Sequence, residues 1–202
     1  MKSLRIMTMT ATFAGFLASG AIADDAQKAP TPEEQAMMAK MQERTTPNEK
    51  HKLLESLAGS WNYRGKFWMD PSQPPQEMLG VSENKMIYGG RFLKQKVSSE
   101  WQGQPFEGMS ITGYDLVRGE YTSLWMDNMG TGIMNASGQY DEATKTLTTE
   151  CAYSCQMTGQ KERWSRSETK FVSADNYVYS SYSRDADGKE FKSMEIAYYR
   201  TP

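Results

Sequence analysis

The chain has 202 residues, of which 24% are charged and 38% are hydrophobic, a composition typical of one globular domain and not of a disordered protein. Its formal net charge is −2 and it has no long run of Lys or Arg, so nucleic acid is not expected as a partner. One histidine and two cysteines are too few for a Cys/His zinc site. These counts exclude most of the familiar metal centres.

Residues 1–23 have the pattern of a secretory signal peptide. Two basic residues precede an apolar stretch over residues 6–18, and Ala21 and Ala23 place small side chains before the expected cleavage point. The apolar part has about 13 residues, fewer than the roughly 20 that cross a bilayer. We therefore expect a periplasmic or secreted protein with no membrane span. Residues 24–32 combine charge with proline and are expected to form a flexible tether.

Residues 33–58 are expected to form two short helices, over about 32–44 and 47–57. Thr31 and Thr46 each precede a proline, with a glutamate three residues after the threonine, which is the arrangement of a helix N-cap. Each cap would satisfy backbone amides at the start of a helix that have no partner within it.

Three methionines, Met37, Met38 and Met41, lie on the first of these helices. Such a stripe is typical of a soft packing surface, so a protein partner is possible through this helix. Binding of copper(I) by thioether groups is the alternative that this pattern leaves open.

After Gly59 the hydrophobic period changes from helical to twofold, which indicates strands. The turns between successive runs are too short for parallel crossovers, so neighbouring strands should pair antiparallel. About ten such strands in residues 59–202 predict a mainly β, up-and-down barrel, because closure removes exposed edges. The runs lie near residues 61–69, 77–88, 91–101, 105–115, 120–128, 132–140, 145–154, 160–172, 176–184 and 189–200.

The stretch Gly59-Ser60-Trp61 resembles the opening signature of lipocalins and other calycins. That resemblance implies a structural role for Gly59 and Arg200, with the Arg200 guanidinium lying across the Trp61 ring. Longer stretches resemble the uncharacterised bacterial family DUF1579 over about residues 49–200, which implies a calycin-like barrel and no established activity. They include His51 to Leu54, Leu57 to Trp61, Lys66 to Met69, Gly89 to Leu93, Pro105 to Gly108, Thr112 to Asp115, Trp125 to Gly132 and Gly188 to Lys192.

The first strand places Trp61, Tyr63 and Phe67 on its apolar face, which points into a barrel. Trp125 and Asp127 share one face of a later strand, so the tryptophan would line a cavity and the carboxylate would anchor a ligand's polar end. These five residues are the candidate ligand site. The alternative is a filled core with Asp127 capping a turn, since a filled and a hollow barrel have the same alternating pattern.

Cys151 and Cys155 are the only cysteines in the sequence, and we predict a disulfide between them. On one straight strand their Cα atoms would lie about 13 Å apart, too far for a bond, so a turn or bulge is required. An oxidising compartment favours the bond. Two free thiols are the alternative.

Three classes of function remain open. The leading one is a non-enzymatic binder of a small apolar or amphipathic molecule in the barrel cavity. The second is a structural or protein-interaction module of the cell envelope with a filled barrel, and the third is an enzyme that uses cavity carboxylates. No cofactor is expected. The barrel layout resembles that of the nitrobindins, which bind haem through a histidine late in the chain, but this sequence has no histidine after His51.

Overall fold

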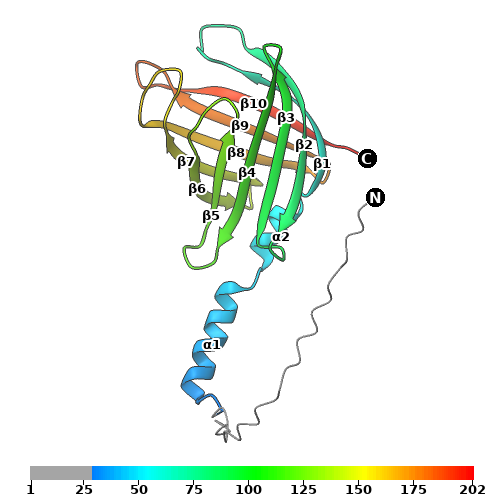
Figure 1. Ribbon diagram of the computed structural model, residues 1–202, viewed down its shortest axis with the longest axis vertical. Helices are drawn as coiled ribbons and strands as arrows, with labels where there is room; N and C mark the ends of the chain where they lie inside the picture. The colour runs from blue at the N-terminus through cyan, green and yellow to red at the C-terminus, as the bar shows by residue number, and fades with distance from the viewer. Residues whose placement is uncertain (1–28) are drawn as a thin grey trace, which may run out of the picture.

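The computed structural model describes residues 29–202, so the expected signal peptide and most of the expected tether lie outside the described residues. Ten antiparallel strands follow two helices, and pairing of the first strand with the last closes the barrel (Figure 1). The predicted mainly β, up-and-down barrel is confirmed. The elements are α1 (Pro32–Thr45), α2 (Glu49–Glu55), β1 (Gly59–Phe67), β2 (Gln76–Ile87), β3 (Phe92–Trp101), β4 (Gln104–Asp115), β5 (Glu120–Asp127), β6 (Met134–Asp141), β7 (Thr146–Tyr153), β8 (Arg163–Ser173), β9 (Asn176–Arg184) and β10 (Glu190–Arg200).

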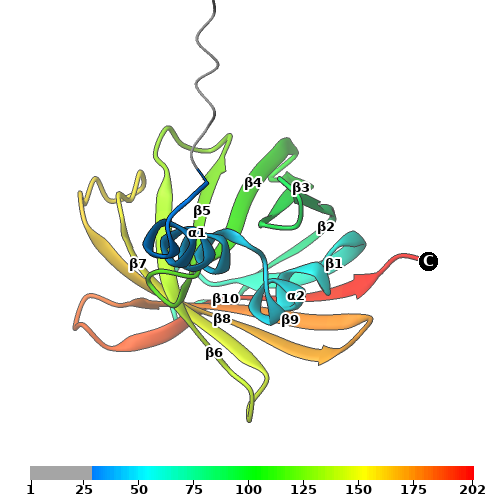
Figure 2. The same ribbon diagram turned by 90° about the horizontal axis from the view of Figure 1, so that it is seen from below.

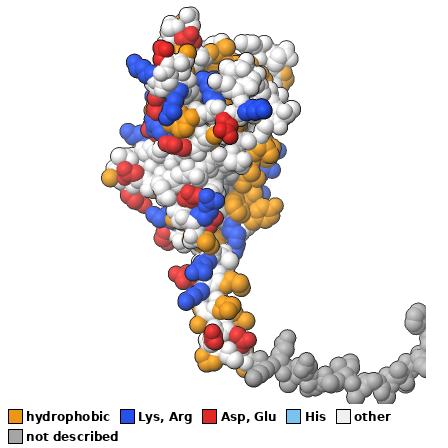
Figure 3. All heavy atoms as spheres, turned by 90° about the vertical axis from the view of Figure 1, so that its left-hand side faces the viewer, with side chains coloured by type: hydrophobic (Ala, Val, Ile, Leu, Met, Phe, Trp, Pro, Cys, Tyr) orange, Lys and Arg blue, Asp and Glu red, His pale blue; other side chains and the backbone are white. Residues whose placement is uncertain are grey.

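Helix α1 begins at the predicted cap. The Thr31 amide donates to the Glu34 carboxylate at 2.7 Å, and the Thr31 hydroxyl accepts from the Glu34 amide at 3.3 Å. The helix projects away from the barrel and none of its residues is buried (Figures 1 and 3). Met37, Met38 and Met41 are therefore all exposed. Neither helix in residues 29–202 has the length and apolar character needed to cross a membrane.

Helix α2 begins later than the predicted Thr46 cap. The Asn48 side chain accepts from the Lys50 amide at 3.0 Å, and the Asn48 amide donates to Nδ1 of His51 at 3.1 Å. The reciprocal pair of Asn48 and His51 satisfies the first amides, so the prediction of a cap at Thr46 is wrong. His51 also packs edge-on against the Tyr114 ring and is buried.

The segment from α2 to Leu57 closes one end of the barrel (Figure 2). Leu54 is fully buried there, and the Leu57 carbonyl accepts from the Trp61 indole and from the Asn84 amide, both at 2.9 Å. The Tyr121 hydroxyl donates to the Lys50 carbonyl at 2.9 Å. We call this the closed end and the opposite end, where the loops after β1, β3, β5, β7 and β9 lie, the open end.

Arg200 joins the start and the end of the barrel at the closed end. Its guanidinium lies 4.1 Å from the centre of the Trp61 ring, which confirms the contact that the calycin resemblance implies. It donates to the Ala58 carbonyl at 2.7 Å and to the Ser56 carbonyl at 2.8 Å. Gly59 leaves the room for it, because a Cβ at Gly59 would lie 2.7 Å from Nη1 of Arg200, and its φ is +121°.

Candidate functional site

The barrel encloses an inner cavity of about 560 Å³. Its lining comes from the inward positions of the strands and from the loops at the open end, while α2 and the buried Trp61 occupy the closed end. Such a volume lies within the range of about 300–1,000 Å³ that is typical of small-molecule sites. The barrel is therefore hollow over part of its length.

Aromatic rings form a continuous column from the closed end to the cavity. Trp61 contacts Tyr177 edge-on at 4.8 Å, Tyr177 stacks on Tyr198 at 4.3 Å, and Tyr198 packs against Tyr63 at 5.3 Å between ring centres. Tyr63 and Tyr198 line the cavity, and so does Phe67, whose ring meets Trp101 edge-on. The structure thus places Trp61 in the packed base below the cavity, outside the cavity lining.

Trp125 and Asp127 meet directly near the open end. The Trp125 indole N–H donates to the Asp127 carboxylate at 2.7 Å, and the other carboxylate oxygen accepts from the Met129 amide at 3.0 Å. The indole lies against Gly108 of β4, where a Cβ would overlap with the ring. Both residues line the cavity. Asp127 therefore orients the indole and fixes the following turn, and it presents both oxygens to partners within the chain.

Hydroxyl groups are the part of the lining that the sequence analysis missed. They reach the cavity from β3, β4, β5 and β7–β10, and several pair with one another. The hydroxyls of Ser165 and Ser181 lie 3.1 Å apart, those of Ser167 and Tyr179 lie 2.9 Å apart, and Ser193 donates to the Ser181 carbonyl at 3.2 Å. The available signal was the alternation of small hydroxyl residues in β8 and β9, where serines take inward positions.

Burial raises the pKa of several tyrosines in this barrel. It raises the pKa of Tyr121 to about 12, with smaller contributions from Tyr114 and Glu142, and it raises the pKa of Tyr179 and Tyr198. A raised pKa in the folded state means that stability is complete below pH about 10, the unfolded tyrosine pKa, and is lost as the pH rises above it.

We therefore expect the free energy of unfolding, measured by urea denaturation, to be constant from pH 8 to 9.5 and to fall by about 2 kcal/mol or more by pH 12. Absorbance at 295 nm should show tyrosines that ionise only as the barrel unfolds. The Tyr121→Phe variant provides the control, because it removes one of the groups responsible and should flatten the profile. A wild-type stability that stays constant to pH 12 would contradict this assignment.

Both cysteines are free in the structure, which thus does not contain the predicted disulfide. The reason is that β7 continues in extended form to Tyr153, paired with β8, so the chain does not turn back between Cys151 and Cys155. Burial raises the pKa of Cys151. Burial also acts to raise the pKa of Cys155, but hydrogen bonds from Thr158, Arg163 and the Met157 amide together outweigh it and lower that pKa.

Charged side chains are few in the cavity lining: among residues 29–202, only Asp127 and Arg163 place a charge there. Arg163 lies near Cys155, with a guanidinium nitrogen 3.7 Å from its sulfur. Within residues 29–202, no three His, Cys, Asp or Glu side chains gather in a way that could hold a metal ion. Six methionines, which are flexible and apolar, also line the cavity: Met69, Met78, Met129, Met134, Met157 and Met194.

Three solved structures are similar to this chain to different degrees. The crystal structure of Rv2717c from M. tuberculosis matches 78% of this chain and all of its own, with 16% identity and a TM-score of 0.57. A redesigned β-barrel matches 74% of this chain and 96% of its own (10% identity, TM-score 0.38). A DUF3598-family protein of unknown function from Nostoc punctiforme matches 73% of this chain and 49% of its own (13% identity, TM-score 0.41).

The comparison with Rv2717c supports the barrel fold alone, because so low an identity does not carry function. No curated protein sequence matches the chain. The model of a family described as "Protein of unknown function (DUF1579)" matches residues 46–200, which is most of the chain. The chain therefore belongs to the DUF1579 family.

Proposed function

We propose that this protein binds a small amphipathic molecule in the inner cavity. The observation that carries the proposal is the cavity itself, about 560 Å³ in volume, with aromatic rings, methionines and hydroxyls in its lining. Aromatic rings contribute apolar contact area at low conformational cost, flexible methionines adapt to the shape of an apolar ligand, and hydroxyls offer hydrogen bonds without a charge. A ligand with an apolar body and uncharged polar groups suits this lining.

Trp125 supports the proposal as a fixed part of the wall. Its indole is held from one side by Asp127 and from the other by Gly108, so its position is set before a ligand arrives. A preorganised wall loses little side-chain entropy when it binds. In this proposal Tyr63, Phe67 and Trp125 contact the ligand, and Asp127 acts through Trp125.

Two neighbouring serines on β3 allow a matched test of cavity binding. Ser99 lines the cavity, whereas Ser98 is exposed on the outer face. We expect the apolar fluorescent probe N-phenyl-1-naphthylamine to bind the wild-type protein, and Ser99→Trp to weaken its affinity by about tenfold or more because the indole fills the cavity.

The Ser98→Trp variant should bind this probe as the wild type does. Circular dichroism and thermal unfolding of both variants would show that the barrel is intact. If the wild type fails to bind the probe, or if both tryptophan variants bind it equally well, the cavity is not the site.

An exported location belongs to the same proposal and rests on the pattern of residues 1–23. N-terminal sequencing of the protein from its native host is expected to give Asp24 as the first residue. A mature chain that starts at Met1 would overturn the exported location and leave cavity binding untouched.

Helix α1 favours a second candidate function, an interaction with another protein. It has no buried residue, and Figure 3 shows hydrophobic side chains along it below the barrel. A deletion distinguishes this candidate from the first. Removal of residues 30–45 should abolish the interaction with the other protein and leave the affinity for N-phenyl-1-naphthylamine unchanged.

A further inference from the structure

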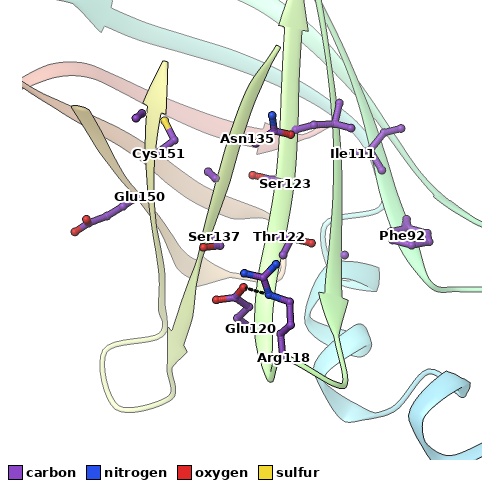
Figure 4. A pocket seen from close by; sticks show the side chains of 14 residues that line it. Phe92, Ile111, Arg118, Glu120, Thr122, Ser123, Asn135, Ser137, Glu150 and Cys151 are labelled. Atoms are coloured by element: carbon purple, nitrogen blue, oxygen red, sulfur yellow. Dashed lines mark ion pairs between the residues drawn. The ribbon is translucent and has the colours of Figure 1, made fainter. Parts of the chain in front are cut away.

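The hydrogen-bonded ladder between β6 and β7 is incomplete. These two strands pair from Asp141↔Thr146 only as far as Ser137↔Glu150. Beyond that pair, residues 134–136 remain bonded to β5 and residues 151–153 remain bonded to β8, but not to each other. Figure 4 shows β6 and β7 diverging toward Asn135 and Cys151. We call this break in the ladder, bounded by residues 134–136 and 151–153, the β6–β7 window.

Loop contacts close the window toward the open end. The Gln156 side chain of the β7–β8 loop lies against Gly130 of the β5–β6 loop, where a Cβ would overlap with its amide. Gly132 lies close to the hydroxyl of Ser154 in the same way, with 3.1 Å between that oxygen and a Cβ built at Gly132. The window is thus bounded by the β6–β7 ladder toward the closed end and by the loop contacts toward the open end.

An outer groove of about 580 Å³ lies on the outer surface at the window. Five residues of β5, β6 and β7 line both this groove and the inner cavity, so the two spaces lie on opposite sides of the same stretch of barrel wall: Thr122, Ser123, Leu124, Ala136 and Cys151. The rest of the groove combines the apolar side chains of Phe92 and Ile111 with the polar side chains of Asn135 and Ser137 (Figure 4).

We propose that the outer groove is the second compartment of the ligand site, reached through the β6–β7 window. The inference rests on the proposed function and extends it. The ligand is an elongated amphiphile whose apolar chain lies in the inner cavity and whose uncharged polar head lies in the outer groove. A glycerol or sugar ester has this chemistry.

The charges in the groove determine the kind of head group. Arg118 pairs with Glu120 at 2.7 Å, so each neutralises the other (Figure 4). Glu150 accepts a hydrogen bond from the Trp164 indole at 3.2 Å and keeps its negative charge, which disfavours an anionic head group. The uncharged groups available to bind a ligand are the hydroxyls of Thr122 and Ser137 and the amide of Asn135. They suit a head group with several hydrogen-bonding atoms and no net charge.

Competition with N-phenyl-1-naphthylamine tests the two compartments separately. The naphthylamine has no polar head and fits the inner cavity, whereas 1-decanoylglycerol needs the groove as well. The Ser137→Trp substitution fills the groove. We expect it to lower the affinity for 1-decanoylglycerol by about tenfold or more and to leave the affinity for the naphthylamine unchanged. Gln139→Trp is the matched control, since Gln139 is exposed on β6 outside the groove and should change neither affinity.

Decanoate tests the charge of the head group, and it should bind the wild type about tenfold more weakly than 1-decanoylglycerol does. Equal affinity of Ser137→Trp and the wild type for 1-decanoylglycerol would overturn the two-compartment site. Decanoate binding as tightly as the ester would overturn the uncharged head. Absence of naphthylamine binding to the wild type is a different result, which would reject cavity binding itself.

Discussion

Replacing Arg200 by alanine is expected to lower the free energy of unfolding by about 3 kcal/mol, because several contacts are lost together. Besides the Trp61 ring and the carbonyls of Ser56 and Ala58, the guanidinium donates to the Ala174 carbonyl at 3.0 Å and pairs with Asp175 at 3.3 Å. Removal would leave the partly buried Ala58 carbonyl and the carbonyls of Ser56 and Ala174 without these donors. It would also release β10 from the segment that closes the barrel.

Arg64 provides a matched control for this prediction. It too is an arginine that links β1 to β10, with its guanidinium 5.3 Å from the Tyr199 ring, but it is exposed to solvent. Arg64→Ala should therefore change stability by less than about 0.5 kcal/mol. Urea denaturation of both variants provides the comparison. Similar losses in the two variants would mean that Arg200 acts as an ordinary surface residue.

The sequence predicts most of the fold because alternation carries the information that a barrel needs. Ten runs of period two with short turns leave little choice besides an antiparallel meander, and β1–β10 pairing follows from closure. The start of α2 was missed for a local reason. Two residues, Thr46 and Asn48, were both able to cap, and the partner that decides between them is the His51 ring.

The candidate site is harder to predict, since alternation shows which residues face inward and says nothing of the space between them. Four of the five predicted site residues line the cavity: Tyr63, Phe67, Trp125 and Asp127. Trp61 also points inward, but it lies in the packed base at the closed end of the barrel. Inward serines such as Ser165 and Ser181 are polar, so the hydrophobic alternation does not mark them as residues that face the barrel interior. The β6–β7 window depends on how far the two strands pair with each other, and this cannot be predicted from the sequence of either strand alone.

Gly138→Ala is expected to destabilise the protein by about 3 kcal/mol, because its Cβ has no room against the neighbouring backbone. A Cβ there would overlap with the Thr148 carbonyl and lie 2.7 Å from the Cα of Thr149. Main-chain atoms in a ladder cannot move aside as a side-chain tip can, so β6 and β7 must separate. Gly132→Ala is the control, since its Cβ would meet only the rotatable Ser154 hydroxyl, and we expect a change below about 0.5 kcal/mol.

Gly138 also sets the lower limit of the β6–β7 window. Its pair with Thr149 lies one step from Ser137↔Glu150, the last pair of this ladder. Separation at Gly138 should therefore extend the window toward the closed end as well as lower stability. Hydrogen exchange should show faster exchange at backbone amides of the β6–β7 ladder in Gly138→Ala, with the β3–β4 ladder unchanged. Uniform acceleration in every strand would instead indicate a general loss of stability, with no local role of Gly138 at the window.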